Sequence, residues 1–270
     1  MEHALAEKLD MLKTELRALG KTAVAFSGGV DSAFLLKTAR SVLGENLAAF
    51  TVCSPAFPAR ERTAARAFCA EERIPLHTVM LEEKDTDAFS ANPPDRCYHC
   101  KRILLEKMLA AAGALGFSSL CEGSNADDTG DYRPGLKAAA ELGVKSPLLD
   151  CGLRKAEVRA LARQSGIAFW DKPSSACLAS RIPYGEPLTK EKLEKIERAE
   201  NFLQDMGFRG VRVRLHGGNT ARIECAENSF PELLARRKDI VQALRAAGFV
   251  YVTLDLQGYR TGSMNEVLGI

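Results

Sequence analysis

The feature that most constrains this chain is the hexapeptide Ser-Gly-Gly-Val-Asp-Ser at residues 27–32. It follows the apolar run 23–26, which predicts a buried strand, and precedes 33–39, whose composition predicts a buried helix. Glycines in such a turn let backbone N–H groups approach a phosphate, and the helix N-terminus adds partial positive charge. The two serines add hydroxyl donors, and Asp31 can hold Mg²⁺ against a nucleotide. The pattern therefore predicts a nucleotide phosphate site.

Two common nucleotide motifs do not fit this stretch. The Walker A motif requires Gly-Lys-Ser/Thr, but no lysine follows Gly29, and the dinucleotide fingerprint requires three spaced glycines. The hexapeptide resembles instead the SGGxDS loop of the PP-loop ATP pyrophosphatases. These enzymes split ATP between the α- and β-phosphates and adenylate a substrate. An ordinary strand-to-helix turn is the alternative, because Gly-Gly and Asp are common in turns.

Length and composition set the outer limits. A chain of 270 residues with 46% hydrophobic residues can form one large domain or two unequal ones, each with a core. The formal net charge of +2 argues against binding a polyanion by bulk electrostatics. Eight irregularly spaced cysteines predict thiols rather than a disulfide framework. Because no apolar run reaches the roughly 18 residues of a membrane helix and the start is charged, we expect a soluble, cytoplasmic protein.

Helices and strands alternate in the first part of the chain. Such alternation predicts an α/β fold with a doubly wound parallel sheet. Ligands of these sheets lie beyond the carboxyl ends of the strands, so Thr51 is expected near the adenosine. After the hexapeptide and its flanks, the expected strands are 47–52, 76–80 and 120–123, and the expected helices are 3–19, 58–73 and 101–112.

An acidic loop follows the predicted strand 120–123. Residues 124–135 gather three acids, an amide and an arginine, a set that suits Mg²⁺ and phosphate contacts. A solvated acidic loop is the alternative. Further on, Ser146-Pro147-Leu148-Leu149 and a helix from Arg154 to Gln164 resemble another PP-loop signature. In that signature a proline–leucine strand end precedes a helix with Lys-x-Glu-Val-Arg.

Residues 92–101 combine a double proline with the pair Cys97 and Cys100. The prolines cannot continue a helix, and Asp95 is expected to cap the helix that follows. Both cysteines then lie on one helix face, three residues apart. Such a pair is a metal or cluster half-site, a redox pair or a coincidence, and the spacing leaves these alternatives open.

The segment 169–185 has no regular apolar period and contains two prolines, so we interpret it as a functional linker. The predicted organisation is a domain at 1–170, a linker at 171–185 carrying Cys177, and a small α+β domain at 186–270. Within this last domain the expected elements are helix 189–206, strands 211–216 and 220–225, helix 230–247 and strand 250–254.

Charged side chains mark the second domain. Glu200 falls on the apolar face of its helix, and a buried carboxylate needs a partner or a metal ion. Alternation places Arg212 and Arg214 on one face of their strand, with Arg222 and Glu224 together on the next strand. This row is a binding face or the solvated outer face of an antiparallel sheet, and alternation alone does not decide.

Along nearly its whole length the chain resembles the LarE-type enzymes, the ATP-dependent sulfur transferases that help to build the nickel-pincer nucleotide cofactor of lactate racemase. The resemblance implies a PP-loop sheet of the adenine nucleotide alpha hydrolase-like kind with a smaller C-terminal α+β domain. In this family ATP adenylates a carboxylate of a pyridinium mononucleotide with loss of pyrophosphate. Sulfur then gives a thiocarboxylate, and AMP leaves. The matching segments are 27–32, 123–128, 131–135, 177–185, 211–214 and 255–260.

The resemblance also implies site residues. For ATP and pyrophosphate they are Ser27, Gly28, Gly29, Asp31, Ser32, Thr51, Gly123, Asp127 and Arg133, with Asp31 and Asp128 on Mg²⁺. For the mononucleotide they are Ser180, Glu200, Arg212, Arg214, Glu224 and Arg260. The implied catalytic residues are Asp31, Cys177, Arg181 and Glu200.

The sulfur source divides the family. Some members sacrifice a cysteine sulfur, and others hold a [4Fe-4S] cluster on three cysteines and pass on a sulfide bound at the fourth iron. Cys97, Cys100 and Cys177 match the cluster-bearing pattern, whereas Cys177 alone would indicate the sacrificial reaction.

Two other function classes remain open. A PP-loop tRNA thiolase shares the adenylation step, but the near-neutral charge and the lack of a basic tract argue against it. A non-catalytic adenine-nucleotide-binding module would not need Asp31, Asp127 and Asp128 near phosphates. We expect ATP and a pyridinium dicarboxylate mononucleotide as ligands, an oligomer of identical chains, and no nucleic acid or membrane partner.

Overall fold

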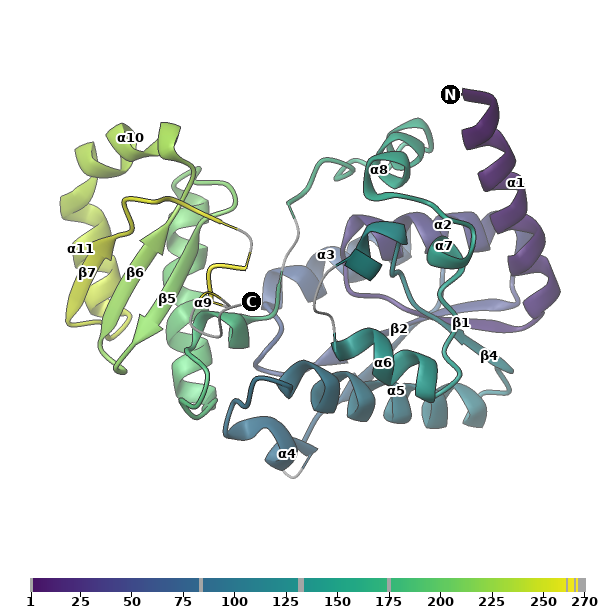
Figure 1. Ribbon diagram of the computed structural model, residues 1–270, viewed down its shortest axis with the longest axis horizontal. Coiled ribbons are helices and arrows are strands. Elements are labelled where there is room, and N and C mark those ends of the chain that lie inside the picture. The colour runs from purple at the N-terminus through teal and green to yellow at the C-terminus, as the bar shows by residue number, and fades with distance from the viewer. Residues whose placement is uncertain are drawn as a thin grey trace. The chain divides into compact units, whose positions relative to one another are not determined.

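The structure is a computed structural model that describes residues 2–82, 85–130, 134–173, 176–260, 262–264 and 266. The chain divides into two compact units (Figure 1). Unit 1 holds Met1–Phe89 and Asp95–Ser175, and unit 2 holds Ser90–Pro94 and Ala176–Ile270. The short segment Ser90–Pro94 joins unit 2 because the Asn92 side chain donates to the carbonyl oxygens of Ile182 and Pro183, at 3.2 and 2.7 Å.

Unit 1 has a parallel sheet between helices. Its strands are β1 (Thr22–Ala25), β2 (Leu47–Cys53), β3 (Leu76–Met80) and β4 (Ser119–Cys121). Its longer helices are α1 (Glu2–Leu19), α2 (Val30–Leu43), α3 (Ala59–Glu71), α5 (Arg96–Ala114), α6 (Pro134–Glu141) and α8 (Lys155–Gln164). Its short elements are α4 (Asp87–Ser90), which ends in unit 2, a 3-10 helix (Ala126–Gly130) and α7 (Pro147–Asp150).

Within the described residues the sheet has the strand order β3-β2-β1-β4, and every pair is parallel. Alternate strand residues face opposite sides, so Val24 and Ala49 pack with α1, α2, α3 and α8. Ala23 and Phe50 pack with α5 and α6 on the other side. Figure 1 shows these helices along the two faces of the sheet. The predicted doubly wound α/β fold is therefore confirmed for unit 1.

One local prediction for unit 1 is wrong, and two are confirmed only in part. The expected strand end at 146–149 is the one-turn helix α7, because Pro147 stands at a first helical position, where a missing N–H does no harm. The strand expected at 120–123 ends at Cys121. Asp95 occupies the N-cap position of α5, but its carboxylate bonds the His99 ring at 3.0 Å and does not cap the helix.

Unit 2 packs helices against a small mixed sheet. Its strands are β5 (Arg212–His216), β6 (Thr220–Glu224) and β7 (Tyr251–Leu254), and its helices are α9 (Lys190–Asp205), α10 (Phe230–Ala235) and α11 (Arg237–Ala246). Two 3-10 turns are Leu178–Arg181 and Glu227–Ser229. β5 and β6 are antiparallel, whereas β6 and β7 are parallel.

One helix prediction in unit 2 is also wrong. The helix expected at 230–247 breaks into α10 and α11 at Arg236, whose backbone leaves the helical region at φ −96° and ψ 14°. The Arg236 guanidinium donates to the Met206 carbonyl oxygen at 2.8 Å, and this tertiary contact favours the break.

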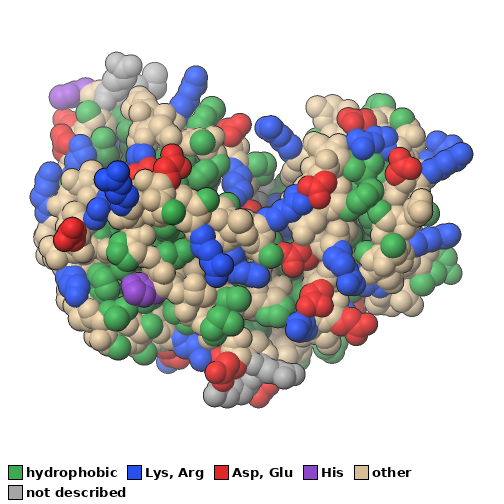
Figure 2. Space-filling model, turned by 180° about the vertical axis from the view of Figure 1, so that it is seen from behind, with side chains coloured by type: hydrophobic (Ala, Val, Ile, Leu, Met, Phe, Trp, Pro, Cys, Tyr) green, Lys and Arg blue, Asp and Glu red, His purple; other side chains and the backbone are tan. Residues whose placement is uncertain are grey.

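The surface gives two further facts. Among the described residues, the helices are all too short or too polar to cross a membrane. On the face drawn in Figure 2, lysine and arginine side chains are interspersed with acidic ones.

Candidate functional site

The phosphate loop connects β1 to α2 at the carboxyl end of β1. Gly29 is the N-cap of α2, and no described side chain caps this end. The first-turn N–H groups of α2 are therefore directed toward an incoming anion. The Ser27 and Ser32 hydroxyls lie 3.1 Å apart, and Ser32 Oγ donates to the Gly29 carbonyl oxygen at 3.1 Å. These bonds fix the loop before a ligand arrives.

Two glycines are required by close approach. Gly28 has φ +79°, and a Cβ there would lie 3.1 Å from the Glu61 carbonyl oxygen. A Cβ on Gly123 would lie 2.9 Å from the Ser32 nitrogen, inside normal contact distance. The segment after β4 therefore packs directly against the first turn of α2, and the structure gives the Gly123 of the sequence motif a steric reason.

Asp31 lies in the first turn of α2, where its Oδ2 bonds the Lys155 ammonium. Its Oδ1 is buried and has no hydrogen-bond partner within the described part of the chain. Burial raises the pKa of Asp31, Lys155 opposes that rise, and the Asp128 charge adds to it. A buried carboxylate oxygen within the electrostatic influence of a second acid suits a cation, so the donor chemistry of Asp31 and Asp128 fits Mg²⁺.

Other predicted members of the ATP site lie around this loop. Asp127 Oδ2 accepts from the Lys155 backbone N–H at 2.8 Å, which ties the acidic loop to the start of α8. Asp128 Oδ2 accepts from the Asn125 N–H at 2.9 Å. Thr51 is buried in β2 next to β1. Arg133 lies outside the described residues.

Three cations near the loop were not assigned a role from sequence: Lys155, Arg159 and Lys172. Arg159 stands one turn after Lys155 on α8, and its Nη2 donates to the Lys172 carbonyl oxygen at 3.3 Å. Lys172 Nζ lies 2.6 Å from Glu61 Oε2. The Lys-x-Glu-Val-Arg run marked Lys155 and Arg159 in the sequence, whereas no sequence pattern pointed to Lys172.

Glu122 is a further buried acid that sequence reasoning missed. It lies just after β4 and bonds Lys101 Nζ at 2.9 Å, Ser124 Oγ at 2.8 Å and Ser146 Oγ at 2.6 Å. Burial alone would raise the pKa of Glu122, but Lys101 and the two hydroxyls outweigh it, so the pKa is lowered. This network ties the cysteine-bearing helix α5 to the end of β4.

The eight cysteines fall into different environments. Burial raises the pKa of Cys225, and it raises the pKa values of Cys69, Cys121 and Cys151 to about 12, so these thiols are unreactive. Cys53 is half-buried at the end of β2. Cys97 is exposed and Cys100 half-buried in the first turns of α5, and half-buried Cys177 precedes the 3-10 turn Leu178–Arg181.

The thiols of Cys97, Cys100 and Cys177 are the ligand type that an iron–sulfur cluster requires. They belong to different units, however: Cys97 and Cys100 to unit 1, Cys177 to unit 2. Within the residues that the structure describes, no three His, Cys, Asp or Glu side chains form a group able to hold a metal ion. The [4Fe-4S] and Mg²⁺ assignments therefore stay proposals.

In unit 2 the predicted burial of Glu200 is confirmed, and its partner is Arg181. Glu200 Oε1 and Oε2 accept from Arg181 Nε and Nη2, both at 2.9 Å, and Oε1 also accepts from the Val213 N–H at 2.9 Å. Burial alone would lower the pKa of Arg181, but Glu200 raises it above its ordinary value. Glu200 thus holds Arg181 and β5 in place.

The arginines of β5 are buried, so the alternative that they lie on a solvated outer face of the sheet is wrong. Arg214 donates to the Ser180 carbonyl oxygen at 2.9 Å, to Glu224 at 2.7 Å and to Ser263 at 3.1 Å. Arg212 lies over the Tyr259 ring, 5.3 Å from its centre. Burial, with Arg181 nearby, lowers the pKa of Arg212.

The structure thus brings Ser180, Arg181, Arg212, Arg214 and Glu224 together in unit 2. The Arg260 side chain is apart from these contacts: it pairs with Glu266 at 3.0 Å and is partly exposed. The sequence named the five residues, but not Ser263, which bridges Arg214 and Glu224.

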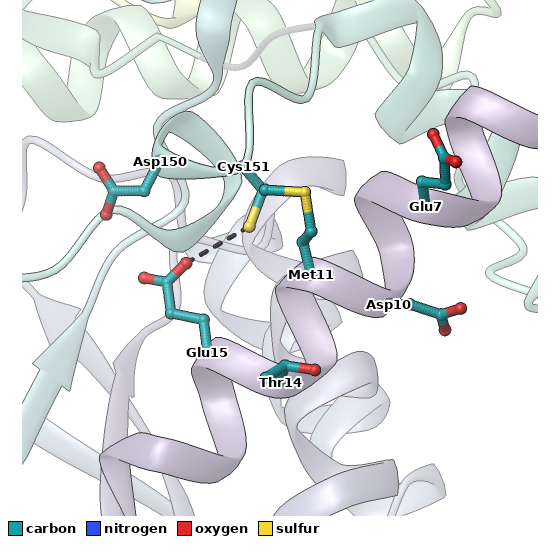
Figure 3. A pocket seen from close by; sticks show the side chains of 7 residues that line it. All are labelled: Glu7, Asp10, Met11, Thr14, Glu15, Asp150 and Cys151. Atoms are coloured by element: carbon teal, nitrogen blue, oxygen red, sulfur yellow. Dashed lines mark hydrogen bonds between the residues drawn. The ribbon is translucent and has the colours of Figure 1, made fainter.

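A separate hollow on unit 1 lies between α1 and α7 (Figure 3). The Cys151 thiol donates to Glu15 at 3.3 Å there. The hollow is lined by Glu7, Asp10, Met11, Thr14, Glu15, Asp150 and Cys151. Its described lining holds four carboxylates and no lysine or arginine, which disfavours a phosphate, so we do not assign the nucleotide to this hollow.

Comparisons with known proteins agree with this geometry. The asparagine synthase family model matches residues 6–108, which include the phosphate loop. The uncharacterized protein slr1717 of Synechocystis sp. is 41% identical over 98% of this chain and 99% of its own length. Pyridinium-3,5-bisthiocarboxylic acid mononucleotide synthase of Lactiplantibacillus plantarum is 37% identical over 98% of this chain and 96% of its own length.

A more distant similarity is to the tRNA-specific 2-thiouridylase MnmA of Arthrobacter sp., which is 30% identical over 73% of this chain and 61% of that protein. The match to the mononucleotide synthase covers 98% of this chain and therefore extends through both units. The chain therefore belongs to the family of LarE-type, ATP-dependent sulfur transferases, a branch of the PP-loop ATP pyrophosphatases.

Proposed function

We propose that this chain adenylates a carboxylate of a pyridinium mononucleotide and converts it into a thiocarboxylate for nickel-pincer cofactor synthesis. The observation that carries the proposal is the 37% identity to a pyridinium-3,5-bisthiocarboxylic acid mononucleotide synthase over 98% of the chain. A carboxylate is unreactive toward sulfur nucleophiles until its oxygen becomes part of a good leaving group. AMP is such a group, and an ATP pyrophosphatase attaches it.

The residues of unit 1 support the ATP half of this reaction. The N-terminus of α2 and the Ser27 and Ser32 hydroxyls would bind the β- and γ-phosphates as a leaving group. Asp31 and Asp128 would hold Mg²⁺, which balances phosphate charge when bound. Asp127, Gly123 and Thr51 would complete the nucleotide site.

The residues of unit 2 support the substrate half. Arg212 and Arg214 are buried and fixed, so they would bind the mononucleotide phosphate without first being ordered. Ser180 and Glu224 would orient Arg214, and Glu200 would orient Arg181 toward the reacting carboxylate. We place Arg260 at the edge of this site.

For the sulfur we propose Cys97, Cys100 and Cys177 as ligands of a [4Fe-4S] cluster. Three protein thiolates leave one iron of such a cluster without a protein ligand. A sulfide held at that iron would be the sulfur that is transferred. Anaerobic reconstitution should give about four irons per chain, because three thiolates hold that cluster type. Any of the three Cys→Ala changes should remove the iron, whereas Cys69→Ala should not.

The sacrificial reaction is the rival for the sulfur source. Mass spectrometry after turnover should show Cys177 intact. A loss at Cys177 of about 34 Da, the mass of H₂S, would make that thiol the donor and overturn the cluster proposal.

The reaction itself is tested by its products. Wild-type protein with ATP and the mononucleotide should form AMP and pyrophosphate, and formation of ADP and phosphate would overturn the proposal. A tRNA thiolase is the second candidate, favoured by the 30% identity to the 2-thiouridylase. A gel shift with bulk tRNA should show no complex, and an oligomer of identical chains should appear in light scattering.

A further inference from the structure

Lys172, to which the sequence assigned no role, extends its ammonium to the phosphate loop. Its Nζ lies 2.6 Å from Glu61 Oε2 and 3.5 Å from the Gly28 carbonyl oxygen. Glu61 stands in the first turn of α3, and a Cβ on Gly28 would lie 3.4 Å from its Oε2. The ion pair between Lys172 and Glu61 therefore rests directly on the turn residue of the loop.

The rest of Lys172 is held by its neighbours. Arg159 Nη2 donates to its carbonyl oxygen at 3.3 Å, which fastens the backbone to α8. Its ammonium also lies 5.7 Å from the centre of the Phe169 ring, and that ring packs edge-on against Phe68 at 5.6 Å. The ammonium can thus change partners while the backbone stays fixed.

Two lysines, each paired with an acid, flank the phosphate loop. Lys155 pairs with Asp31 on α2, and Lys172 pairs with Glu61 on α3. The side chains of Lys172 and Glu61 are 26% and 17% exposed, so water reaches the pair and weakens its attraction. An anion with several charges at the loop can therefore displace Glu61 from Lys172. An ammonium is a compact point charge that suits phosphate oxygens.

We infer that Lys172 is a pyrophosphate-binding residue that exchanges Glu61 for the leaving group of ATP. This inference rests on the proposed function, since only cleavage between the α- and β-phosphates produces pyrophosphate at the loop. A substrate carboxylate oxygen bonds to the α-phosphorus, and the bond from that phosphorus to the bridging oxygen breaks. The electron pair leaves on the bridging oxygen, which becomes part of pyrophosphate, and the Lys172 ammonium offsets part of that negative charge. Glu61 holds Lys172 when the loop is empty.

The first test is the binding of inorganic pyrophosphate, with Mg²⁺, to Lys172→Gln protein, measured by calorimetry. We expect binding to weaken at least tenfold, about 1.4 kcal/mol, because one phosphate cation is lost. Binding of AMP, which lacks the leaving group, should change less than about twofold. Lys37→Gln is the matched control: Lys37 pairs with Glu72, and their side chains are 29% and 17% exposed. Lys37→Gln should change neither affinity.

Glu61→Gln separates a binding role from a structural one. If Lys172 binds pyrophosphate, Glu61→Gln releases the ammonium, and pyrophosphate binds as tightly as in wild type or more tightly. If the pair only fastens the loop, Lys172→Gln and Glu61→Gln weaken binding alike. Wild-type pyrophosphate affinity in Lys172→Gln, or equal weakening in both variants, overturns the inference.

The products of ATP separate this inference from the proposed function. Turnover of ATP to ADP by wild-type protein overturns the proposed function and the leaving-group role together. Formation of AMP and pyrophosphate, with unchanged pyrophosphate affinity in Lys172→Gln, overturns only the role of Lys172.

Discussion

Removal of the Glu200 carboxylate tests whether unit 2 depends on its buried ion pair with Arg181. The two side chains are 5% and 1% exposed, and they share two hydrogen bonds of 2.9 Å. Removing one partner of a buried pair costs about 3–5 kcal/mol, because the other charge stays buried without its partner. Glu200→Ala also leaves the Val213 N–H without its acceptor. We expect the free energy of unfolding of unit 2 to fall by about 4 kcal/mol.

A milder variant, Glu200→Gln, measures how much the negative charge alone contributes to the unfolding free energy. Glu200→Gln keeps one oxygen that can accept from Arg181 or Val213, but it loses the negative charge. A hydrogen bond to a charged group contributes about 1.5–3 kcal/mol, so Glu200→Gln should lower the unfolding free energy by about 2 kcal/mol. Glu194→Gln on the same helix is the control. Glu194 pairs with Lys190 while half exposed, so this change should stay within about 0.5 kcal/mol.

The assay must resolve the two units. Urea unfolding followed by circular dichroism reports on both, and hydrogen exchange of the β5 amides reports on unit 2. Trp170, the only tryptophan, belongs to unit 1, so its fluorescence follows that unit separately. A loss below about 1 kcal/mol in Glu200→Ala, or equal losses in Glu200→Ala and Glu194→Gln, would refute the reasoning.

Three further predictions concern unit 1. Asp31→Asn should abolish formation of AMP from ATP yet stabilise the fold at pH 7. Burial raises the pKa of Asp31, so ionisation destabilises the wild type as pH rises through that pKa, and thermal melts should converge as pH falls toward 4. Gly123→Ala should lower the unfolding free energy by about 1–3 kcal/mol and weaken ATP binding, because its Cβ would lie 2.9 Å from the Ser32 nitrogen. Gly113→Ala, in an open part of α5, should be neutral or stabilising in the same urea titration. Alkylation of native protein at pH 8, read by mass spectrometry, should leave unmodified the buried thiols of Cys69, Cys121 and Cys151.

Periodicity predicted most elements because those elements bury one face each. The strand at 76–80 has the predicted limits, and the helices at 3–19 and 189–206 end within about two residues of theirs. The prediction of a strand end at Pro147 was wrong because a proline–leucine run fits both a strand end and a first helical turn. Local sequence does not decide between them. The turn forms here because Leu148 is buried in the core under α1 and α2.

The chemistry of the site was only partly predictable for a related reason. A loop motif is contiguous, so Ser27 to Ser32 could be recognised in the sequence. Ion pairs join residues that are far apart in the chain, such as Lys172 with Glu61 or Arg181 with Glu200. The burial of Glu200 could be inferred from its helix face, but the identity of its partner required the tertiary fold.

The charge balance of the two candidate sites differs, and the difference fits their proposed ligands. Among the described residues around the phosphate loop, which do not include Arg133, four carboxylates lie with three cations; these are Asp31, Glu61, Asp127 and Asp128 with Lys155, Arg159 and Lys172. Among the described residues of the arginine cluster in unit 2, three carboxylates lie with four cations; these are Glu200, Glu224 and Asp255 with Arg181, Arg212, Arg214 and Arg222. A site with surplus negative charge binds a phosphate chain only when a metal ion accompanies it, whereas a site with surplus positive charge binds a bare anion. The balance therefore favours Mg²⁺–ATP at the loop and a metal-free mononucleotide phosphate at the arginines of β5. It also argues against the reverse assignment, because a metal ion carried into the arginine cluster would meet a net positive charge there.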